Sequence, residues 1–207
     1  MQIRRRTKVF VIGSFRPEHC EGEKARFEQA CQLLGGALSE ADCDLILNSE
    51  RPATADPYIF KGYADNKSGN VQIFRPDPEH AEGEATRPFS NADKTWIRVK
   101  QDPRPVGTFR TSHLRSIGAS DVVVAIGGSP RGTLNALGAA DVLGRPVAGV
   151  TAFGGAAAQG YRDYSSYYRG DAALNELLTA NPGEFDDAWA HGFAKGVVRL
   201  AKLGADS

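Results

Sequence analysis

The stretch DVVVAIGGSPRGT (Asp121–Thr133) decides the fold. Its first half is an uninterrupted apolar run rich in β-branched residues, which is typical of a strand buried on both faces of a parallel sheet. Two glycines follow at once, and Leu134, Leu137 and Ala140 then recur at helical spacing. A buried strand, a glycine turn and a helix in this order predict one βα unit of an α/β fold.

Similar patterns extend this unit in both directions. Apolar runs at 8–14, 44–49, 71–76 and 146–157 predict further strands, and TWIRVK (95–100) predicts an added edge strand. Helical patterns separate the strands, although Gly35-Gly36 predicts an early end for the first helix. The chain therefore predicts a Rossmann-like, doubly wound parallel sheet with helices on both faces and strand order 3-2-1-4-5.

Two helix starts stand out in the sequence. Asp56 precedes Pro57 and is expected as the N-cap of the second helix. Asn181 and Glu184 have the spacing of a capping box, which predicts the start of a final helix. The apolar stripe of that helix, which is expected to be core, consists of Phe185, Trp189, Phe193, Val197 and Leu200.

Length and composition set the class of protein. The 207 residues predict a single domain, 1–207, with a loop excursion around 77–94 and C-terminal helices over 171–203. Lys plus Arg balances Asp plus Glu at 25 each, so charge predicts neither nucleic acid nor a membrane surface as a partner. The apolar runs are too short for a secretory signal or a membrane helix.

Cysteine and histidine usage points to the cytoplasm and away from metal chemistry. The three cysteines form no C-x-x-C pair, which suits a reducing compartment better than a disulfide framework or a zinc site. The four histidines are scattered along the chain. We therefore expect a cytoplasmic protein with no metal site and no required cofactor.

A crevice is predicted where the strand order reverses. In a sheet of this order, ligands bind there, beyond the carboxyl ends of the strands. The loops GSFRPE (13–18) and GGSPRGT (127–133) both fall at that point. Glycine lets the second loop turn sharply, and unpaired backbone N–H groups of Gly132 and Thr133 at a helix start favour an anion. The two loops therefore predict a phosphate-binding crevice.

The second loop departs from two familiar nucleotide motifs. It runs G-x-x-x-x-G, but Thr133 stands where the P-loop of phosphoryl-transfer proteins carries lysine. That lysine follows the β- and γ-phosphates during transfer. The dinucleotide motif G-x-G-x-x-G is also unmatched. The loop thus favours anion binding over phosphoryl transfer or the usual mode of NAD binding.

Side chains around the crevice suggest how the rest of a ligand is held. Arginine suits bidentate phosphate contacts, and aromatic rings after the last strand can stack a base. The candidate ligand-binding residues are Gly13, Ser14, Phe15, Arg16, Ser49, Glu50, Arg51, Arg110, Gly127, Gly128, Ser129, Arg131, Gly132, Thr133, Phe153, Gly154 and Gly155. Further stacking candidates are Tyr161, Tyr164, Tyr167 and Tyr168. No catalytic residue is assigned, although Glu18, Glu50 or Asp56 could supply an acid, and Glu50 could reach a ribose.

The segments KVFVIGSFRPE, LILNSERPATADPYIFKGYA and DVVVAIGGSPRGTLNALGAADVLGRPVAGVTAFGGAA resemble the SLOG superfamily. The similarity is clearest over Lys8–Tyr63 and Asp121–Ala157. This Rossmann-like group includes the Lonely Guy phosphoribohydrolases and sensor modules of bacterial antiphage effectors. The resemblance implies a nucleotide or a related sugar phosphate in the crevice.

The Lonely Guy enzymes carry the motif P-G-G-x-G-T-x-x-E, whose glutamate is catalytic. Gly127, Gly128, Gly132 and Thr133 match its glycines and threonine, although the loop here is two residues longer. Ala136 occupies the glutamate position, so the binding half of the motif is present and the catalytic half is missing. The proline of the motif is replaced by Ile126, and the upstream arginine of those enzymes could be Arg110 or Arg115.

The sequence therefore favours a sensor or regulatory domain that binds a nucleotide-derived second messenger, of ADP-ribose or cyclic-nucleotide type, in antiphage signalling. A Lonely Guy-like N-glycosidase or nucleoside transferase is the alternative, and a structural or interaction domain is the second. The resemblance also implies a homodimer or higher homo-oligomer and a fused or separate effector domain.

Overall fold

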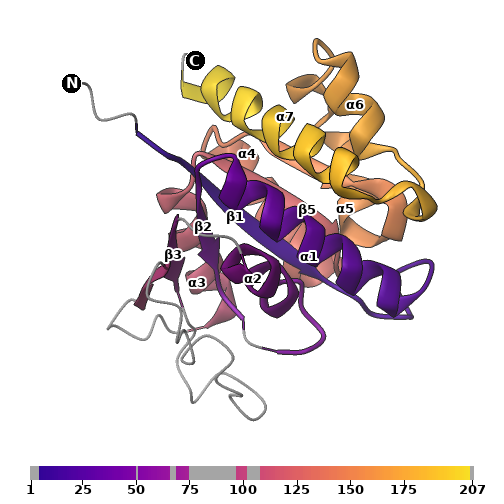
Figure 1. The fold of residues 1–207 in the computed structure, drawn as a ribbon, viewed down its shortest axis with the longest axis horizontal. Helices are drawn as coiled ribbons and strands as arrows, with labels where there is room; N and C mark the ends of the chain where they lie inside the picture. The colour runs from indigo at the N-terminus through magenta and orange to yellow at the C-terminus, as the bar shows by residue number, and fades with distance from the viewer. Residues whose placement is uncertain (1–4, 50, 66–68, 75–96, 102–107, 206–207) are drawn as a thin grey trace.

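The computed structural model of the protein describes residues 5–49, 51–65, 69–74, 97–101 and 108–205 (Figure 1). It contains a six-stranded, all-parallel sheet of order β4-β3-β2-β1-β5-β6. The strands are β1 (Thr7–Ser14), β2 (Cys43–Leu47), β3 (Gly69–Ile73), β4 (Ile97–Gln101), β5 (Val122–Gly127) and β6 (Val147–Val150). The predicted order 3-2-1-4-5 is confirmed, with β4 as the added edge strand, and the fold is Rossmann-like.

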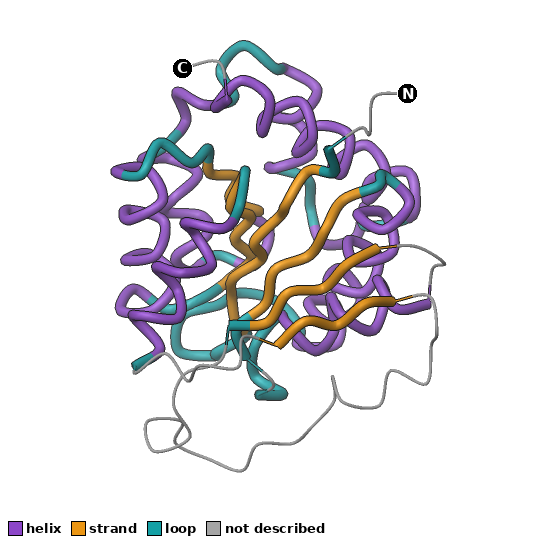
Figure 2. The backbone as a smooth tube through the Cα atoms, turned by 90° about the vertical axis from the view of Figure 1, so that its left-hand side faces the viewer, coloured by secondary structure: helices purple, strands orange, loops and turns teal. Residues whose placement is uncertain are grey.

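Helices cover both faces of this sheet (Figure 2). They are α1 (Lys24–Glu40), α2 (Asp56–Asp65), α3 (Phe109–Ala119), α4 (Asn135–Val142), α5 (Gly155–Asp163), α6 (Ala172–Leu178) and α7 (Asp187–Ala205). Short helical turns span Pro130–Leu134, Thr151–Phe153, Ser165–Tyr167 and Pro182–Glu184. Alternate residues of β1 point to opposite layers: Val9 and Val11 pack with α1, α2 and α7, whereas Phe10 and Ile12 pack with α3 and α4.

The first helix does not end at Gly35-Gly36, so that prediction was wrong. Helix α1 continues to Glu40 because its glycine serves helix packing. A Cβ atom at Gly35 would overlap the carbonyl oxygen of Ile59 in α2, and a Cβ atom at Gly62 would overlap that of Gln32 in α1. The two backbones therefore lie too close for any side chain at these positions.

The C-terminal helices anchor each other by polar contacts. Asp171 caps α6 by accepting a hydrogen bond from the N–H of Leu174, and it also accepts two hydrogen bonds from Arg199 of α7. The predicted capping box of Asn181 and Glu184 is present, but it starts the short turn Pro182–Glu184 and α7 begins only at Asp187. The apolar stripe of α7 is buried, as predicted.

The predicted loop excursion is not tested by the described structure and stays a prediction. The expected excursion at 77–94 lies outside the described residues. None of the described helices is both long and apolar enough to cross a bilayer.

Replacing Gly35 with alanine should destabilise the protein, since the new methyl group must push α1 and α2 apart. We expect the free energy of unfolding to fall by about 2 kcal/mol or more. The matched control is Gly118→Ala in α3, where a Cβ atom meets no atom within 4 Å. This control should stay within about 1 kcal/mol of the wild type, or gain stability. Urea denaturation measures the free energy of unfolding of both variants. Equal values for Gly35→Ala and Gly118→Ala would contradict the packing role of Gly35.

Candidate functional site

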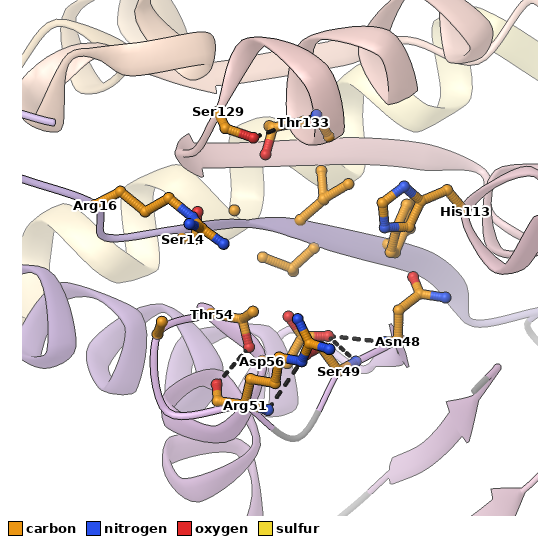
Figure 3. A pocket seen from close by; sticks show the side chains of 16 residues that line it. Ser14, Arg16, Asn48, Ser49, Arg51, Thr54, Asp56, His113, Ser129 and Thr133 are labelled. Atoms are coloured by element: carbon orange, nitrogen blue, oxygen red, sulfur yellow. Dashed lines mark hydrogen bonds between the residues drawn. The ribbon is translucent and has the colours of Figure 1, made fainter. Parts of the chain in front are cut away.

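A pocket lies at the carboxyl edge of β1, β2 and β5, where the strand order reverses (Figure 3). Its cavity volume is about 190 Å³. Ser129 and Thr133 form one wall, and residues from the end of β2 to the start of α2 form the opposite wall. The predicted residues that line it are Gly13, Ser14, Arg16, Ser49, Arg51, Ser129, Gly132 and Thr133. The pocket therefore brings together loops that are far apart in the sequence.

Two glycines turn the chain from β5 into the first wall. Gly127 and Gly128 have φ angles of 59° and 92°, which residues with a side chain rarely adopt. The N–H of Gly128 donates to the carbonyl oxygen of Ser14, 2.8 Å away, and this bond ties the turn to the end of β1. A Cβ atom at Gly128 would overlap the side chain of Thr133. Glycine is thus required for Thr133 to fold back over the turn.

The helix start in this wall differs from the expected one. We predicted unpaired N–H groups at Gly132 and Thr133, but both are bonded to Ser129: Gly132 to its side-chain oxygen at 3.3 Å and Thr133 to its carbonyl oxygen at 3.0 Å. Ser129 is therefore the N-cap of the helical segment that continues into α4. The polar groups left for a ligand are the hydroxyls of Ser129 and Thr133 at the positive end of this helix.

The Thr133 hydroxyl is well placed for such a contact. Thr133 is 4% exposed, and its side chain faces the pocket (Figure 3). Its hydroxyl makes no hydrogen bond with the described residues. A hydroxyl that faces a pocket without a protein partner can donate to an anionic oxygen. Arg16 adds positive charge at one end of the pocket, and its ion pair with Glu18 is loose, at 3.8 Å.

The opposite wall is organised by a buried carboxylate. Asp56 is the first residue of α2, and its carboxylate accepts hydrogen bonds from the backbone N–H groups of Asn48, at 2.7 Å, and Ser49, at 3.0 Å. Asp56 is therefore a link back to β2, in place of the simple N-cap that we expected. Burial raises the pKa of Asp56 to about 6, although hydrogen bonds from the backbone of Asn48 and Ser49 and from the Thr54 side chain work against that rise. Near neutral pH this carboxyl group can both hold and release a proton.

The polar lining residues that the sequence analysis missed are Asn48, Thr54 and His113. Asn48 donates from Nδ2 to the carbonyl oxygen of Phe74 at 2.8 Å, whereas its Oδ1 is buried without a partner in the described part of the chain. His113 comes from α3, and burial lowers its pKa to about 4, so it is neutral at pH 7. Asn48 directly follows β2, so its position could have identified it. No sequence signal marks His113, because its place depends on how α3 packs.

A second cavity, of about 340 Å³, adjoins the pocket between α3 and α4. The two cavities share His113 and Gly132 as lining residues. Arg110 and Arg131 line the second cavity and not the first. Ala136 lines it too, so the position at which the resemblance expects a glutamate does face this space.

Several predicted residues lie elsewhere. Phe15 and Phe153 are buried in the core, where both pack against Phe27. Gly154 and Gly155 lie behind the glycine turn, since a Cβ atom at Gly155 would contact the carbonyl oxygen of Gly128. Glu50 lies outside the described residues.

The tyrosines are not part of the pocket lining either. Tyr161 and Tyr168 stack on each other with ring centroids 5.2 Å apart, and the Tyr161 hydroxyl donates to Asn175. The Tyr167 hydroxyl donates to Asp141 of α4. These rings hold α5, α6 and the following turns together, so this surface offers no free aromatic platform at the pocket. Within the described ranges, no three His, Cys, Asp or Glu side chains gather as metal ligands.

Known structures resemble this chain in fold. The chain is similar to the structural-genomics target TM1055, with 23% identity over 74% of this chain and 79% of that one and a TM-score of 0.54. It is also similar to DNA processing protein A from Helicobacter pylori, whose structure concerns single-stranded DNA binding, with 13% identity, 93% and 80% coverage and a TM-score of 0.52. A molybdenum cofactor binding protein from Rippkaea orientalis aligns with 16% identity, 70% and 76% coverage and a TM-score of 0.46.

No protein-family model matches the sequence, and no curated protein matches it. The first two structures share the Rossmann-like α/β fold of this chain, which is the fold that the resemblance to the SLOG superfamily implied.

The buried Asp56 should make stability depend on pH in a defined direction. Its pKa is about 6 in the folded protein and about 4 in an unfolded chain, so folding favours the protonated form. This group therefore supports the fold most at low pH, and its support is lost as the pH rises from about 4 to about 6. In Asp56→Asn the contribution is absent, so the variant should gain stability relative to the wild type by about 2–3 kcal/mol between pH 4 and pH 7.

Denaturant unfolding of both proteins at a series of pH values measures this difference. Parallel stability curves across the whole range would contradict a buried, pKa-shifted Asp56.

Proposed function

We propose that this pocket binds the phosphorylated end of a nucleotide or nucleotide-derived small molecule, and that the protein acts as a binding module. One observation carries the proposal: the hydroxyls of Ser129 and Thr133 lie at a helix N-terminus, in a pocket that Arg16 and Arg51 also line. Hydroxyl donors, the positive end of a helix and arginines together suit a phosphate group.

The lining of the second cavity favours binding over turnover. Ala136 stands where the resemblance to Lonely Guy enzymes expects a glutamate, and the described lining of the second cavity contains no carboxylate. Without such a group, that cavity lacks the negative charge that would stabilise a developing positive charge on a sugar. The resemblance to the SLOG superfamily extends this proposal. It suggests a second-messenger sensor in antiphage signalling that works with an effector domain and forms a homo-oligomer.

A specific observation also supports an N-glycosidase as the second candidate. Asp56 lines the pocket, and its carboxyl group has a pKa of about 6. In such a reaction a water oxygen would bond to the anomeric carbon, the carbon–nitrogen bond would break, and the base would leave with a proton. A carboxyl group with a pKa near the working pH can deliver that proton or accept one from the water.

Isothermal titration calorimetry with AMP, ADP-ribose and a cyclic dinucleotide tests the binding proposal. At least one of these should bind the wild type, and Thr133→Ala should weaken that binding about 10-fold or more, because a hydrogen bond to a charged group is lost. Thr179→Ala is the matched control, since Thr179 is exposed at the end of α6 and bonds only within that helix. Equal affinities of the wild type and Thr133→Ala would refute this placement of the site.

Chromatography of the same mixtures separates binding from turnover. A pure binding module leaves each nucleotide intact, whereas release of free base identifies the glycosidase. In that case Asp56→Asn should lose the release of base while it still binds the nucleotide. A single-stranded DNA oligomer belongs in the same titrations, because the absence of a nucleic-acid partner is still a prediction.

A further inference from the structure

The pocket contains a hydrogen-bond acceptor that the protein leaves unsatisfied. Asn48 is 4% exposed, and its Oδ1 has no partner among the described residues. The orientation of this carboxamide is fixed, because Nδ2 donates to the carbonyl oxygen of Phe74, which can only accept. Figure 3 shows the side chain reaching from the β2 wall toward His113. A buried, unsatisfied acceptor is costly, so a ligand that brings a donor is favoured there.

A second acceptor lies beside the first. The backbone N–H of Asn48 donates to the Asp56 carboxylate, so the two residues are neighbours on the same wall. Both line the pocket, opposite Ser129 and Thr133. The backbone N–H groups of Asn48 and Ser49 engage one carboxylate oxygen, Oδ1. The Thr54 side chain also hydrogen-bonds to this carboxylate, which still has lone pairs left to accept from a ligand. The wall therefore presents Asn48 Oδ1 and the Asp56 carboxylate as adjacent acceptors to a ligand whose phosphate contacts the facing wall.

A ribose is the part of a nucleotide that matches this wall. Its 2′- and 3′-hydroxyls are two adjacent, uncharged donors, and they lie on the side of the sugar away from the 5′-phosphate. The pocket, at about 190 Å³, suits a sugar and its phosphate, and the adjoining cavity of about 340 Å³ leaves room for a base. Guanine also carries two neighbouring donors, N1–H and its 2-amino group, but that edge lies at the far end of the nucleotide from the phosphate, whereas the diol belongs to the sugar beside it.

We propose that Asn48 and Asp56 recognise the cis-diol of a ribose, so that this pocket selects ribonucleotides over deoxyribonucleotides. This inference rests on the proposed function, since the phosphate must first be held by the Ser129–Thr133 wall. It makes the ligand a molecule with a free 2′,3′-diol beside its phosphate ester, such as a ribonucleoside 5′-phosphate or a derivative of ADP-ribose.

Calorimetric titration with AMP, 2′-deoxy-AMP and 3′-deoxy-AMP tests the inference. Each deoxy analogue should bind the wild type about 10-fold or more weakly than AMP, because one acceptor then stays buried without a donor. In Asn48→Leu the acceptor is gone, so AMP should lose affinity and at least one deoxy analogue should bind as well as AMP. Asn70→Leu is the matched control: Asn70 is exposed on β3, away from the pocket, and should leave the preference unchanged.

A second variant keeps the test decisive if Asn48→Leu fails to fold, as judged from its melting temperature. Asp56→Asn retains an oxygen for the backbone N–H groups of Asn48 and Ser49 but loses one acceptor, so it should reduce the preference for AMP over the deoxy analogues. Inosine monophosphate, which lacks the amino group of adenine, should bind the wild type like AMP. If inosine monophosphate binds much more weakly than AMP while the deoxy analogues bind as well as AMP, Asn48 contacts the base and the inference is overturned.

Failure of the inference is distinguishable from failure of the proposed function. If AMP and both deoxy analogues bind equally, and Thr133→Ala weakens all three, the phosphate site stands and the ribose inference is wrong. If none of the three nucleotides binds, and neither ADP-ribose nor the cyclic dinucleotide binds, both are wrong.

Discussion

The pairing of β1 with β5 is the constraint on which the site depends. Ser14 lies opposite Gly127 at the last position of the register, and the Gly128 N–H then bonds to the Ser14 carbonyl oxygen. A Cβ atom at Gly13 would overlap the carbonyl oxygen of Ile126, so the strands can approach this closely only with glycine there. Since both strands run in parallel and end together, the loops that follow must share one edge of the sheet. The pocket follows from this pairing.

The two walls of the pocket are built by different physical means. The Ser129–Thr133 wall is set by a glycine turn and a helix cap, which place two hydroxyls at the positive end of a helix. The Asn48–Asp56 wall is set by burial of polar groups, whose cost is only partly offset by hydrogen bonds within the protein. Such incomplete satisfaction favours a state in which a ligand supplies the remaining donors.

Much of the fold could be predicted from the sequence because buried parallel strands have a clear signature. The run Val122–Ile126 is apolar without a break, and the strand order followed from the βαβ rhythm. The end of α1 could not be predicted in this way. Gly35 is required because the backbone of α2 packs directly against it, and a local sequence pattern does not show that neighbour. The capping box at Asn181 was found, but the turn that it caps is short, and α7 begins after it.

The site was only partly predictable for the same reason. Residues at the end of a strand or shortly after it, such as Ser14, Ser49 and Ser129, do line the pocket. Phe153 was expected there because it follows β6, but its apolar ring is core. His113 and the neighbour relation of Asn48 and Asp56 depend on tertiary contacts between separate elements. Residue type and position near a strand end thus identify the edge of the sheet, whereas packing decides which side chains face the ligand.

The most direct test of this account is a titration of the ¹⁵N-labelled protein with AMP, followed by amide chemical shifts. The account predicts that the largest shifts fall on the backbone amides of Ser129, Gly132 and Thr133 and on the side-chain Nδ2 of Asn48, since these residues line the two walls of one pocket. Shifts confined to α6 and α7, or no shifts at saturating AMP, would contradict it.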